Sequence, residues 1–160
     1  MSFLVDTSHR SSDTEIMDDF TMKGVLLRDT LDKLEIINRF LGGNSVTMNG
    51  LKKILKNQPK NKTITIVDLG CGNGDILRDV AKFGRKNSYS FKLIGIDANP
   101  TAIGYAKELS KEYSELSYKK IDIFSEDFKK QSFDIALCTL FLHHISCLLY
   151  TSDAADEQFG

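Results

Sequence analysis

The spacing of apolar residues divides the chain into a helical first part and a second part in which strands and helices alternate. In the first sixty residues, apolar side chains recur at three- and four-residue steps, the period of one face of a helix. One run ends at Gly42-Gly43-Asn44, where glycine stops a helix, and a shorter run follows. The pattern predicts a helical hairpin whose apolar positions are Val25, Leu27, Leu31, Leu34, Ile37 and Leu41, then Val46, Leu51, Ile54 and Leu55.

The period changes after the polar stretch Pro59-Lys60-Asn61-Lys62. Four short runs rich in β-branched or aromatic residues predict strands, and two amphipathic segments between the first three of them predict helices. Such alternation favours an α/β fold, a Rossmann-like doubly wound and mostly parallel sheet with right-handed crossovers. The predicted strands are residues 63–67, 91–96, 116–121 and 133–138, and the predicted helices are residues 74–86 and 101–113.

Composition and charge narrow the class of protein. A chain of 160 residues with 41% hydrophobic and 27% charged content is typical of one soluble globular domain. No run approaches the roughly 18–20 apolar residues of a membrane-spanning helix, and the N-terminus lacks the pattern of a secretory signal. The formal net charge of −1, with its basic residues scattered, gives no electrostatic argument for nucleic-acid binding. We therefore expect no membrane insertion and no nucleic-acid partner.

The three cysteines are Cys71, Cys138 and Cys147. They are not spaced as metal ligands, so we expect no metal site. Pairing two of them in a disulfide would leave one over. Free thiols in a reducing compartment, and therefore a cytoplasmic location, are the simpler interpretation.

The last residues of the chain look foreign to the rest. From Cys147 to Glu157 they read CLLYTSDAADE, which resembles one translated frame of a transposase adapter used for sequencing libraries. We therefore expect residues 147–160 to be a non-native tail and the natural chain to be cut off after Ser146. The tail holds the acids Asp153, Asp156 and Glu157 and no basic residue, so without it the formal net charge changes from −1 to +2.

The first predicted strand runs into a glycine-rich turn, Asp68-Leu69-Gly70-Cys71-Gly72-Asn73-Gly74, that opens a helix. Glycines let the backbone bend tightly there and let a ligand approach the backbone amides. The spacing is G-x-G-x-G, whereas turns that bind a dinucleotide usually read G-x-G-x-x-G. Asp68 would repel a pyrophosphate and suits a cationic group such as an amine.

The second predicted strand ends at Asp97. An acid at this place can accept hydrogen bonds from both hydroxyls of a ribose. Together with Asp68 it indicates a ligand that has an amine and a ribose but no phosphate.

This constellation resembles the class I S-adenosylmethionine-dependent methyltransferases over about residues 63–145. The resemblance implies S-adenosyl-L-methionine as the cofactor, with the glycine turn receiving its methionine part and the acid after the second strand holding its ribose. It implies that Cys71 is a small spacer within the turn. The cofactor-binding residues carried over from these two segments are Asp68, Gly70, Cys71, Gly72, Gly74, Asp97, Ala98 and Asn99.

The resemblance extends to the third and fourth strands. An acid after the third strand usually faces the adenine amino group in this family, which places Asp122 there with Ile123 beside it. The fourth strand would reach under the methionine part with Cys138 and Thr139. His143 and His144 follow it, and either could remove a proton from a hydroxyl acceptor. Alternatively, the histidine pair only closes the strand and packs against the cofactor.

The first helices resemble those of small-molecule methyltransferases that carry an Met-Asp-Asp segment and an Asn-Arg pair, here Met17-Asp18-Asp19 and Asn38-Arg39. The resemblance implies a helical cap over residues 1–60 and a cofactor-binding core over residues 61–146. No Asn-Pro-Pro-aromatic segment follows the fourth strand, and no Pro-Cys pair is found, as nucleic-acid methyltransferases would have. A small-molecule methyl acceptor is therefore favoured, without indication of its identity, the methylated atom or the oligomeric state.

Two alternatives remain at this point. A Rossmann-type oxidoreductase that binds NAD(P) would also have a glycine-rich turn, and a non-catalytic nucleotide-binding fragment would have the same sequence features. The family's sheet has seven strands in the order 3-2-1-4-5-7-6, and the predicted strands account for four. We therefore expect a chain truncated after the fourth strand and inactive by itself.

Overall fold

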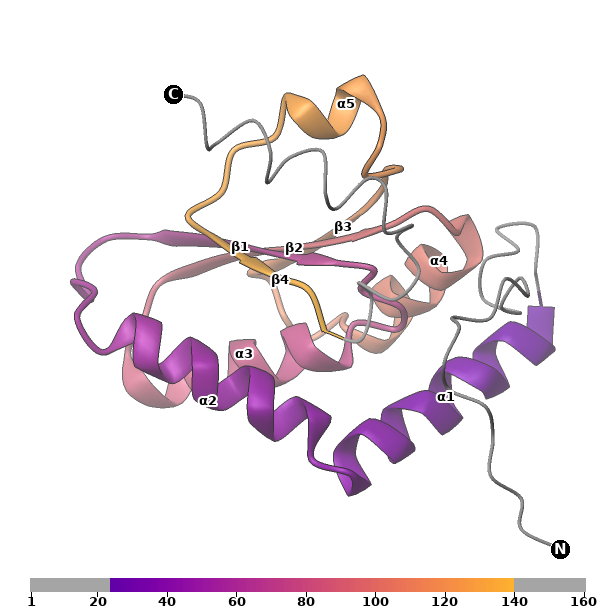
Figure 1. Cartoon of the computed structure of the whole chain (residues 1–160), viewed down its shortest axis with the longest axis horizontal. Helices are drawn as coiled ribbons and strands as arrows, with labels where there is room; N and C mark the ends of the chain where they lie inside the picture. Colours follow the sequence, from indigo (N-terminus) through magenta and orange to yellow (C-terminus); the bar gives the residue numbers. More distant parts are fainter. Residues whose placement is uncertain (1–23, 140–160) are drawn as a thin grey trace, which may run out of the picture.

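The structure, a computed structural model, describes residues 24–139 (Figure 1). Two helices come first, and strands and helices then alternate, as the sequence predicts. The elements are α1 (Gly24–Phe40), α2 (Gly43–Leu55), β1 (Ile64–Leu69), α3 (Asp75–Asn87), β2 (Phe91–Asp97), α4 (Pro100–Leu109), β3 (Leu116–Lys120), α5 (Glu126–Lys129) and β4 (Ile135–Leu137).

The four strands form one parallel sheet in the order β3-β2-β1-β4. Ile66 of β1 is paired with Leu93 of β2 on one side and with Ile135 of β4 on the other. This arrangement confirms the predicted Rossmann-like, mostly parallel sheet. Because β1 lies between β2 and β4, the turn that follows β1 lies at the middle of the carboxyl edge, where open α/β sheets bind ligands.

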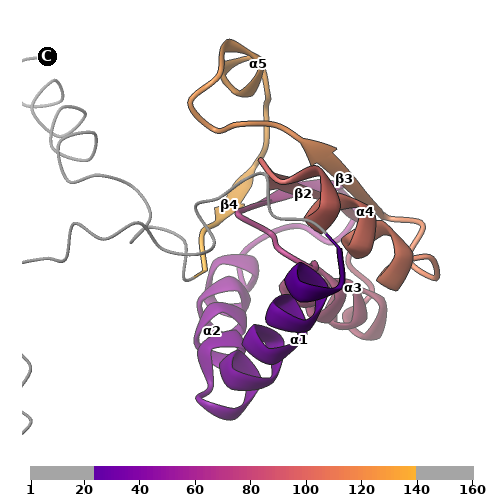
Figure 2. The same cartoon turned by 90° about the vertical axis from the view of Figure 1, so that its right-hand side faces the viewer.

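The sheet has a helical layer on one face and a single short helix on the other. Helices α1, α2, α3 and α4 lie together below the sheet in Figure 1, while α5 lies above it. Figure 2 shows the same separation after a quarter turn. Leu51 and Leu55 of α2 belong to the core cluster that also holds Ile66 and Leu93, so α2 shares one core with the sheet. On the other face Val67 and the neighbouring β2 residues pack with Phe128 of α5 in a separate cluster.

The two N-terminal helices bury only part of the apolar pattern that predicted them. Leu27 and Leu31 are buried, but Val25 is 83% exposed and Leu41 is 76% exposed. The apolar spacing thus predicts the helices correctly but does not show which of their residues are buried. The buried side of this helix also includes Glu35, whose polar partners lie far along the chain, and periodicity cannot reveal such partners.

A close contact between β2 and β3 requires glycine at position 95. A Cβ atom there would overlap with the ring of Tyr118 and would lie 2.9 Å from Sγ of Cys71. Tyr118 is 6% exposed, and its hydroxyl is hydrogen-bonded to Oγ of Ser110 at 2.8 Å. The ring of Tyr118 therefore fills the space beneath the turn that follows β1.

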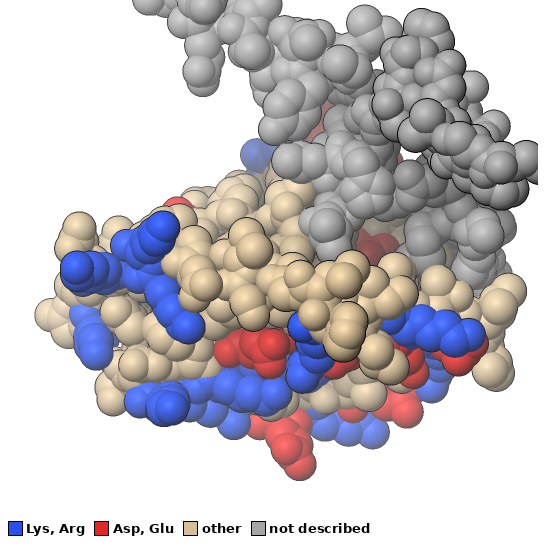
Figure 3. All heavy atoms as spheres, turned by 60° about the horizontal axis from the view of Figure 1, so that its bottom comes forward, with Lys and Arg blue, Asp and Glu red and all other residues tan. Residues whose placement is uncertain are grey.

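The surface of the helical layer carries charges of both signs. Lys and Arg side chains lie among Asp and Glu side chains on the face that comes forward in Figure 3. Several of these groups form ion pairs, among them Arg39 with Glu35 at 3.2 Å and Lys82 with Asp79 at 3.3 Å. Among the helices within residues 24–139, none is long and apolar enough to cross a membrane.

Candidate functional site

The turn between β1 and α3 adopts a conformation that only glycine accepts readily. Gly70, Gly72 and Gly74 have φ angles of 68°, 50° and 78°, which are in the left-handed region that is costly for residues with a Cβ. The amide of Gly74 donates to the carbonyl of Cys71 at 2.8 Å, and the amide of Cys71 donates to Ile96 of β2 at 3.0 Å. The G-x-G-x-G spacing thus builds a tight turn that is joined to the end of β2.

Gly74 is required for a second, steric reason. A Cβ atom at this position would overlap with the hydroxyl end of Tyr118, which lies under the turn. Burial raises the pKa of Tyr118 to about 12, so the phenol remains protonated and hydrogen-bonded at neutral pH. The turn therefore lies on a rigid apolar support.

Asp97 connects the turn to the end of β2. Its Oδ2 atom accepts a hydrogen bond from the amide of Gly72 at 3.1 Å, and its Oδ1 atom accepts one from the amide of Asn99 at 2.8 Å. Burial raises the pKa of Asp97, and the backbone N–H groups of Asn99, Gly72 and Ala98 offset part of that rise. The carboxylate is thus held beside the glycine turn.

Asp68, the last but one residue of β1, is a buried carboxylate without a hydrogen bond from any residue in the described range. Asp68 as a whole is 4% exposed. Burial raises the pKa of Asp68 well above its usual range, and the negative charges of Asp75 and Asp97 add to the rise. A buried carboxyl beside two further acids favours either a proton or a cation as its partner.

Helix α2 brings another unpaired acceptor to the same end of the sheet. Asn44 is 6% exposed, and its Nδ2 atom donates to Asp75 at 2.9 Å. Its Oδ1 atom is itself fully buried and accepts no hydrogen bond from residues 24–139. One turn further along α2, the hydroxyls of Thr47 and Thr139 lie 2.9 Å apart, which connects this helix to the residues after β4. A buried acceptor without a donor is costly, so Asn44 is a place where a donor from a ligand would be stabilising.

The two described cysteines are free thiols. The side chain of Cys71 is 4% exposed and belongs to the core beneath the turn, so only its backbone faces the site. Burial, together with the nearby charges of Asp68 and Asp97, raises the pKa of the Cys71 thiol well above its usual range. Burial also raises the pKa of Cys138, which follows β4, with Asp68 as a second cause. These thiols are poor nucleophiles at neutral pH.

The residues predicted to lie near the adenine also make hydrogen bonds or apolar contacts within the protein. Oδ1 of Asn99 caps α4 by accepting from the amides of Thr101 at 2.8 Å and Ala102 at 3.3 Å. Asp122 is exposed and accepts from the amide of Phe124 at 2.9 Å, while Ile123 is partly buried in the cluster under α5. The amide of Ile121 donates to the carbonyl of Asp97 at 3.1 Å, so the segment after β3 follows the end of β2.

The remaining predictions concern residues outside the described range. His143 and His144, the Met17-Asp18-Asp19 segment and the tail from Cys147 all lie outside residues 24–139. Their roles stay predictions.

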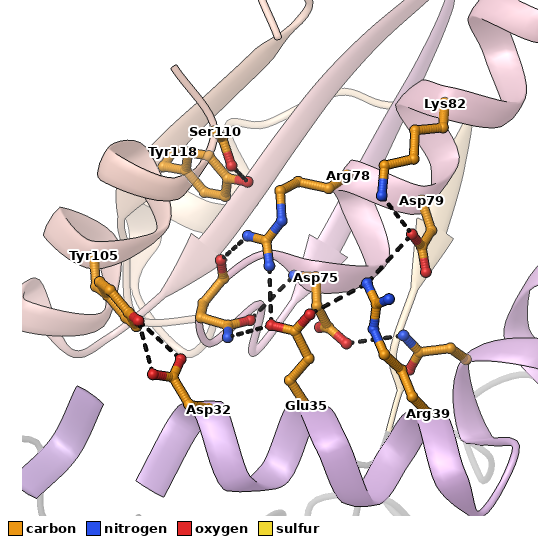
Figure 4. Close-up of polar contacts among 12 residues, drawn as sticks. Asp32, Glu35, Arg39, Asp75, Arg78, Asp79, Lys82, Tyr105, Ser110 and Tyr118 are labelled. Carbon is orange, nitrogen blue, oxygen red and sulfur yellow. Dashed lines mark hydrogen bonds and ion pairs between the residues drawn. The ribbon is translucent and has the colours of Figure 1, made fainter. Parts of the chain in front are cut away.

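Sequence reasoning missed a polar network in which α1 contacts the glycine turn (Figure 4). Oε2 of Glu35 accepts from Nδ2 of Asn73, inside the turn, at 2.8 Å and from the guanidinium of Arg78 at 3.0 Å. No motif marks Glu35, because its partners lie 38 and 43 residues away. Asn73 stands between two glycines of the recognised turn, and this position is the only feature of the sequence that could have indicated the network.

A family model described as a methyltransferase domain matches residues 60–152. The match covers the whole sheet and continues into the segment predicted to be a foreign tail.

Two curated proteins are similar to this chain over about half of its length. The putative methyltransferase 235L of Invertebrate iridescent virus 6 is 33% identical over 95 residues, which cover 53% of this chain and 33% of the viral protein. The protein-lysine N-methyltransferase EFM4 of Saccharomyces cerevisiae is 30% identical over 80 residues, which cover 48% of this chain and 33% of the yeast protein. The chain thus spans about a third of the length of these curated relatives.

The fold is similar to that of solved methyltransferases. The plantazolicin methyltransferase BpumL, solved in complex with S-adenosylhomocysteine, aligns with a TM-score of 0.52 and 23% sequence identity. The alignment covers 80% of this chain and 46% of BpumL. Because the family model matches more than half of the sequence and the parallel sheet has the expected strand order, the chain belongs to the methyltransferase domain family, the class I S-adenosylmethionine-dependent methyltransferases.

Proposed function

We propose that residues 24–139 bind S-adenosylmethionine, the cofactor of this family, at the carboxyl ends of β1 and β2, for methyl transfer to a small-molecule acceptor. The observation that carries the proposal is the buried carboxylate of Asp68, which has no hydrogen bond from the described residues and lies just before the glycine turn. A cationic amine would give this carboxylate the partner that the protein itself does not supply.

The unpaired acceptors fit the methionine end of the cofactor. Its ammonium group is a donor with a positive charge. Asp68 is a buried carboxylate with no hydrogen bond from the described residues, and Oδ1 of Asn44 is a fully buried acceptor without a donor in the same range. The same acceptors fit a pyrophosphate poorly, because Asp68, Asp75 and Asp97 would repel its negative charges. This charge argument supports S-adenosylmethionine over the alternative of a NAD(P)-dependent oxidoreductase.

The acid after β2 fits the ribose. Each oxygen of the Asp97 carboxylate accepts one backbone amide and retains a further lone pair for a ribose hydroxyl. Ala98, Asn99, Asp122 and Ile123 follow β2 and β3 at the same edge of the sheet, and we assign the adenine to this side.

The protein's part in the reaction is binding and orientation. S-Adenosylmethionine supplies the methyl group on an activated sulfonium, so the chain contributes mainly proximity and alignment. Gly70, Gly72 and Gly74 give the turn a tight shape without side chains, so that a ligand can approach its backbone closely. Cys138 and Thr139 follow β4, and Thr139 contacts Thr47 of α2. In our proposal, His143 or His144 removes a proton where the acceptor is a hydroxyl.

We propose a small-molecule acceptor because the sequence lacks the motifs of nucleic-acid methyltransferases. BpumL, a methyltransferase named for plantazolicin, supports this choice, whereas the yeast relative is named for protein lysine. In this proposal residues 1–60 form a cap and residues 61–146 form the cofactor-binding core.

Calorimetric titration of the purified chain tests the proposal. We expect saturable binding of S-adenosylhomocysteine and no heat with NAD or NADP. Binding of NAD in place of S-adenosylhomocysteine would overturn it and favour the oxidoreductase. Transfer of a radiolabelled methyl group to extracted metabolites, compared with transfer to extracted protein, then tests the acceptor class.

A further inference from the structure

The middle of the glycine turn is held by groups that belong to helices. Asn73 is 3% exposed, and its Oδ1 atom accepts from the amide of Asp75 at 3.2 Å. Its Nδ2 atom donates to Glu35 at 2.8 Å, and its backbone carbonyl accepts from the guanidinium of Arg78. The two side-chain polar atoms and the carbonyl are all used, so the orientation of this residue is fixed by α1 and α3.

Glu35 joins these contacts. One of its carboxylate oxygens accepts from both Asn73 and Arg78, and the other lies 3.2 Å from Arg39. The side chain of Arg78 is only 10% exposed, and Glu35 is its ion-pair partner within residues 24–139. Figure 4 shows Glu35 on α1 pointing toward Arg78 of α3. A buried guanidinium that lost this carboxylate would be left with an uncompensated charge.

Helix α1 also contacts the turn through an apolar side chain. Leu31 lies one helical turn before Glu35 and is 5% exposed. Its Cδ2 atom is 3.2 Å from the position that a Cβ of residue 72 would occupy. Thus α1 contacts two successive residues of the turn, Gly72 through Leu31 and Asn73 through Glu35.

The first half of α1 is fastened to α4. The hydroxyl of Tyr105 donates to both carboxylate oxygens of Asp32 at 2.8 and 2.9 Å, and Arg28 forms an ion pair with Glu108 at 3.0 Å. Because α1 is held at α4 and at α3, it crosses the turn with little freedom to shift.

We propose that Glu35 is a positioning residue, which fixes the glycine turn through Asn73 and Arg78 in the shape that receives the cofactor. The link to the cofactor rests on the proposed function, whereas the restraint on the turn does not. By thermodynamic reciprocity, a ligand that binds the ordered turn also stabilises the docking of α1.

Three variants separate this role from a general loss of stability. Glu35→Gln removes the charge at the network, and Asp29→Asn removes a charge from the solvent side of the same helix, where Asp29 pairs with Lys33. The double variant Glu35→Leu with Arg78→Met replaces both buried charges by apolar groups, which often preserves stability, but still deprives Asn73 of its acceptor.

Amide hydrogen exchange without ligand is the first measurement. We expect exchange within residues 70–74 to become at least tenfold faster in Glu35→Gln and in the double variant, with β1 and β2 unchanged in the double variant. Asp29→Asn should exchange as the wild type does. Wild-type exchange at residues 70–74 in a folded double variant would overturn the proposal.

Binding of S-adenosylhomocysteine is the second measurement. Affinity should fall at least tenfold, about 1.4 kcal/mol, in Glu35→Gln and in the double variant and should not change in Asp29→Asn. Equal affinity in all four proteins would overturn the positioning role while leaving the cofactor assignment intact. If the wild type does not bind the ligand but exchange at residues 70–74 still depends on Glu35, the cofactor assignment fails and the restraint stands.

Discussion

The carboxylate of Asp97 accepts a hydrogen bond from the backbone amide of Gly72 at 3.1 Å, which joins the end of β2 to the middle of the glycine turn. The same carboxylate accepts from the amide of Asn99 and so orients the start of α4. One side chain therefore sets the relative positions of the two segments that we assign to the cofactor.

Replacing Asp97 should weaken cofactor binding strongly. In Asp97→Ala the ribose loses a charged acceptor and the turn loses a restraint, so we expect affinity for S-adenosylhomocysteine to fall by about 10- to 100-fold, using about 1.5–3 kcal/mol for a hydrogen bond to a charged group. Asp134→Ala is the matched control, because Asp134 also accepts a backbone amide, that of Thr65 at 2.8 Å. Titration calorimetry measures both variants, and an equal loss in the control would contradict the assignment.

Replacing Gly74 should destabilise the fold. Gly74→Ala adds a methyl group against Tyr118 at a φ of 78°. We expect a loss of about 2–4 kcal/mol in the free energy of unfolding, from overpacking and from the left-handed backbone.

Gly50→Ala serves as the control for Gly74. Gly50 lies within α2, with nothing within 4 Å of an added Cβ, so the change should stabilise the chain by about 0.5–1 kcal/mol. Urea denaturation measures both effects. A Gly74→Ala variant as stable as the wild type would show that Tyr118 yields at little cost.

Asp68 should make ligand binding depend on pH. Its pKa is raised above the ordinary value of 3.8 in the folded chain, so the folded state keeps a proton that the unfolded chain releases. The stabilising contribution is complete below that ordinary pKa and is lost as the pH rises through the raised pKa. A cationic ligand favours the ionised carboxyl, so affinity should increase with pH over the same range.

The variant Asp68→Asn separates this group from the other acids. The ligand-free variant should lose less stability than the wild type as the pH rises, and its affinity for S-adenosylhomocysteine should be lower with a flatter pH dependence. Thermal unfolding between pH 4 and 8, together with calorimetry in two buffers of different ionisation enthalpy, measures both effects. The exposed variant Asp29→Asn should keep the wild-type profile. Identical slopes in Asp68→Asn and the wild type would exclude Asp68 as the group responsible.

The described thiols should react slowly. Burial raises the pKa of Cys71 and Cys138, so little thiolate exists at neutral pH. With iodoacetamide and peptide mass spectrometry, we expect Cys138, which is partly exposed, to be alkylated before Cys71, and both to react more slowly than glutathione. Cys71→Ala should retain ligand binding within about twofold, since the side chain faces the core. Rapid alkylation of Cys71 in the native chain would contradict this arrangement.

Most of the sheet could be predicted from the sequence because its two central strands, β1 and β2, are largely buried and rich in β-branched or aromatic residues. In residues 91–96 the only charged residue is Lys92, and the predicted strands agree with β1 to β4 within a few residues. The short helix α5 was not predicted, since four residues are too few for a helical period. The buried face of α1 could not be predicted either, because its burial depends on polar partners in α3 and α4.

The residues of the candidate site likewise fall into those that the sequence predicts and those that it does not. Asp68, the three glycines and Asp97 belong to local patterns, and the structure brings them to one edge of the sheet. Asn44 and Glu35 carry no local signal, since each acquires its meaning from a partner more than thirty residues away. The structure also assigns Asn99 to capping α4, a task that the sequence reading overlooked.

The ring of Tyr118 lies against both Gly74 and Gly95, with the thiol of Cys71 at the same contact. These residues come from three different segments of the chain but pack in the same small space, so a change of side-chain size at one position affects the others. A larger residue at 74 or 95 would be tolerated only after a smaller one had replaced Tyr118, and the reverse order would pass through a destabilised protein. The order of substitution at these sites is therefore constrained in any evolving lineage of this domain.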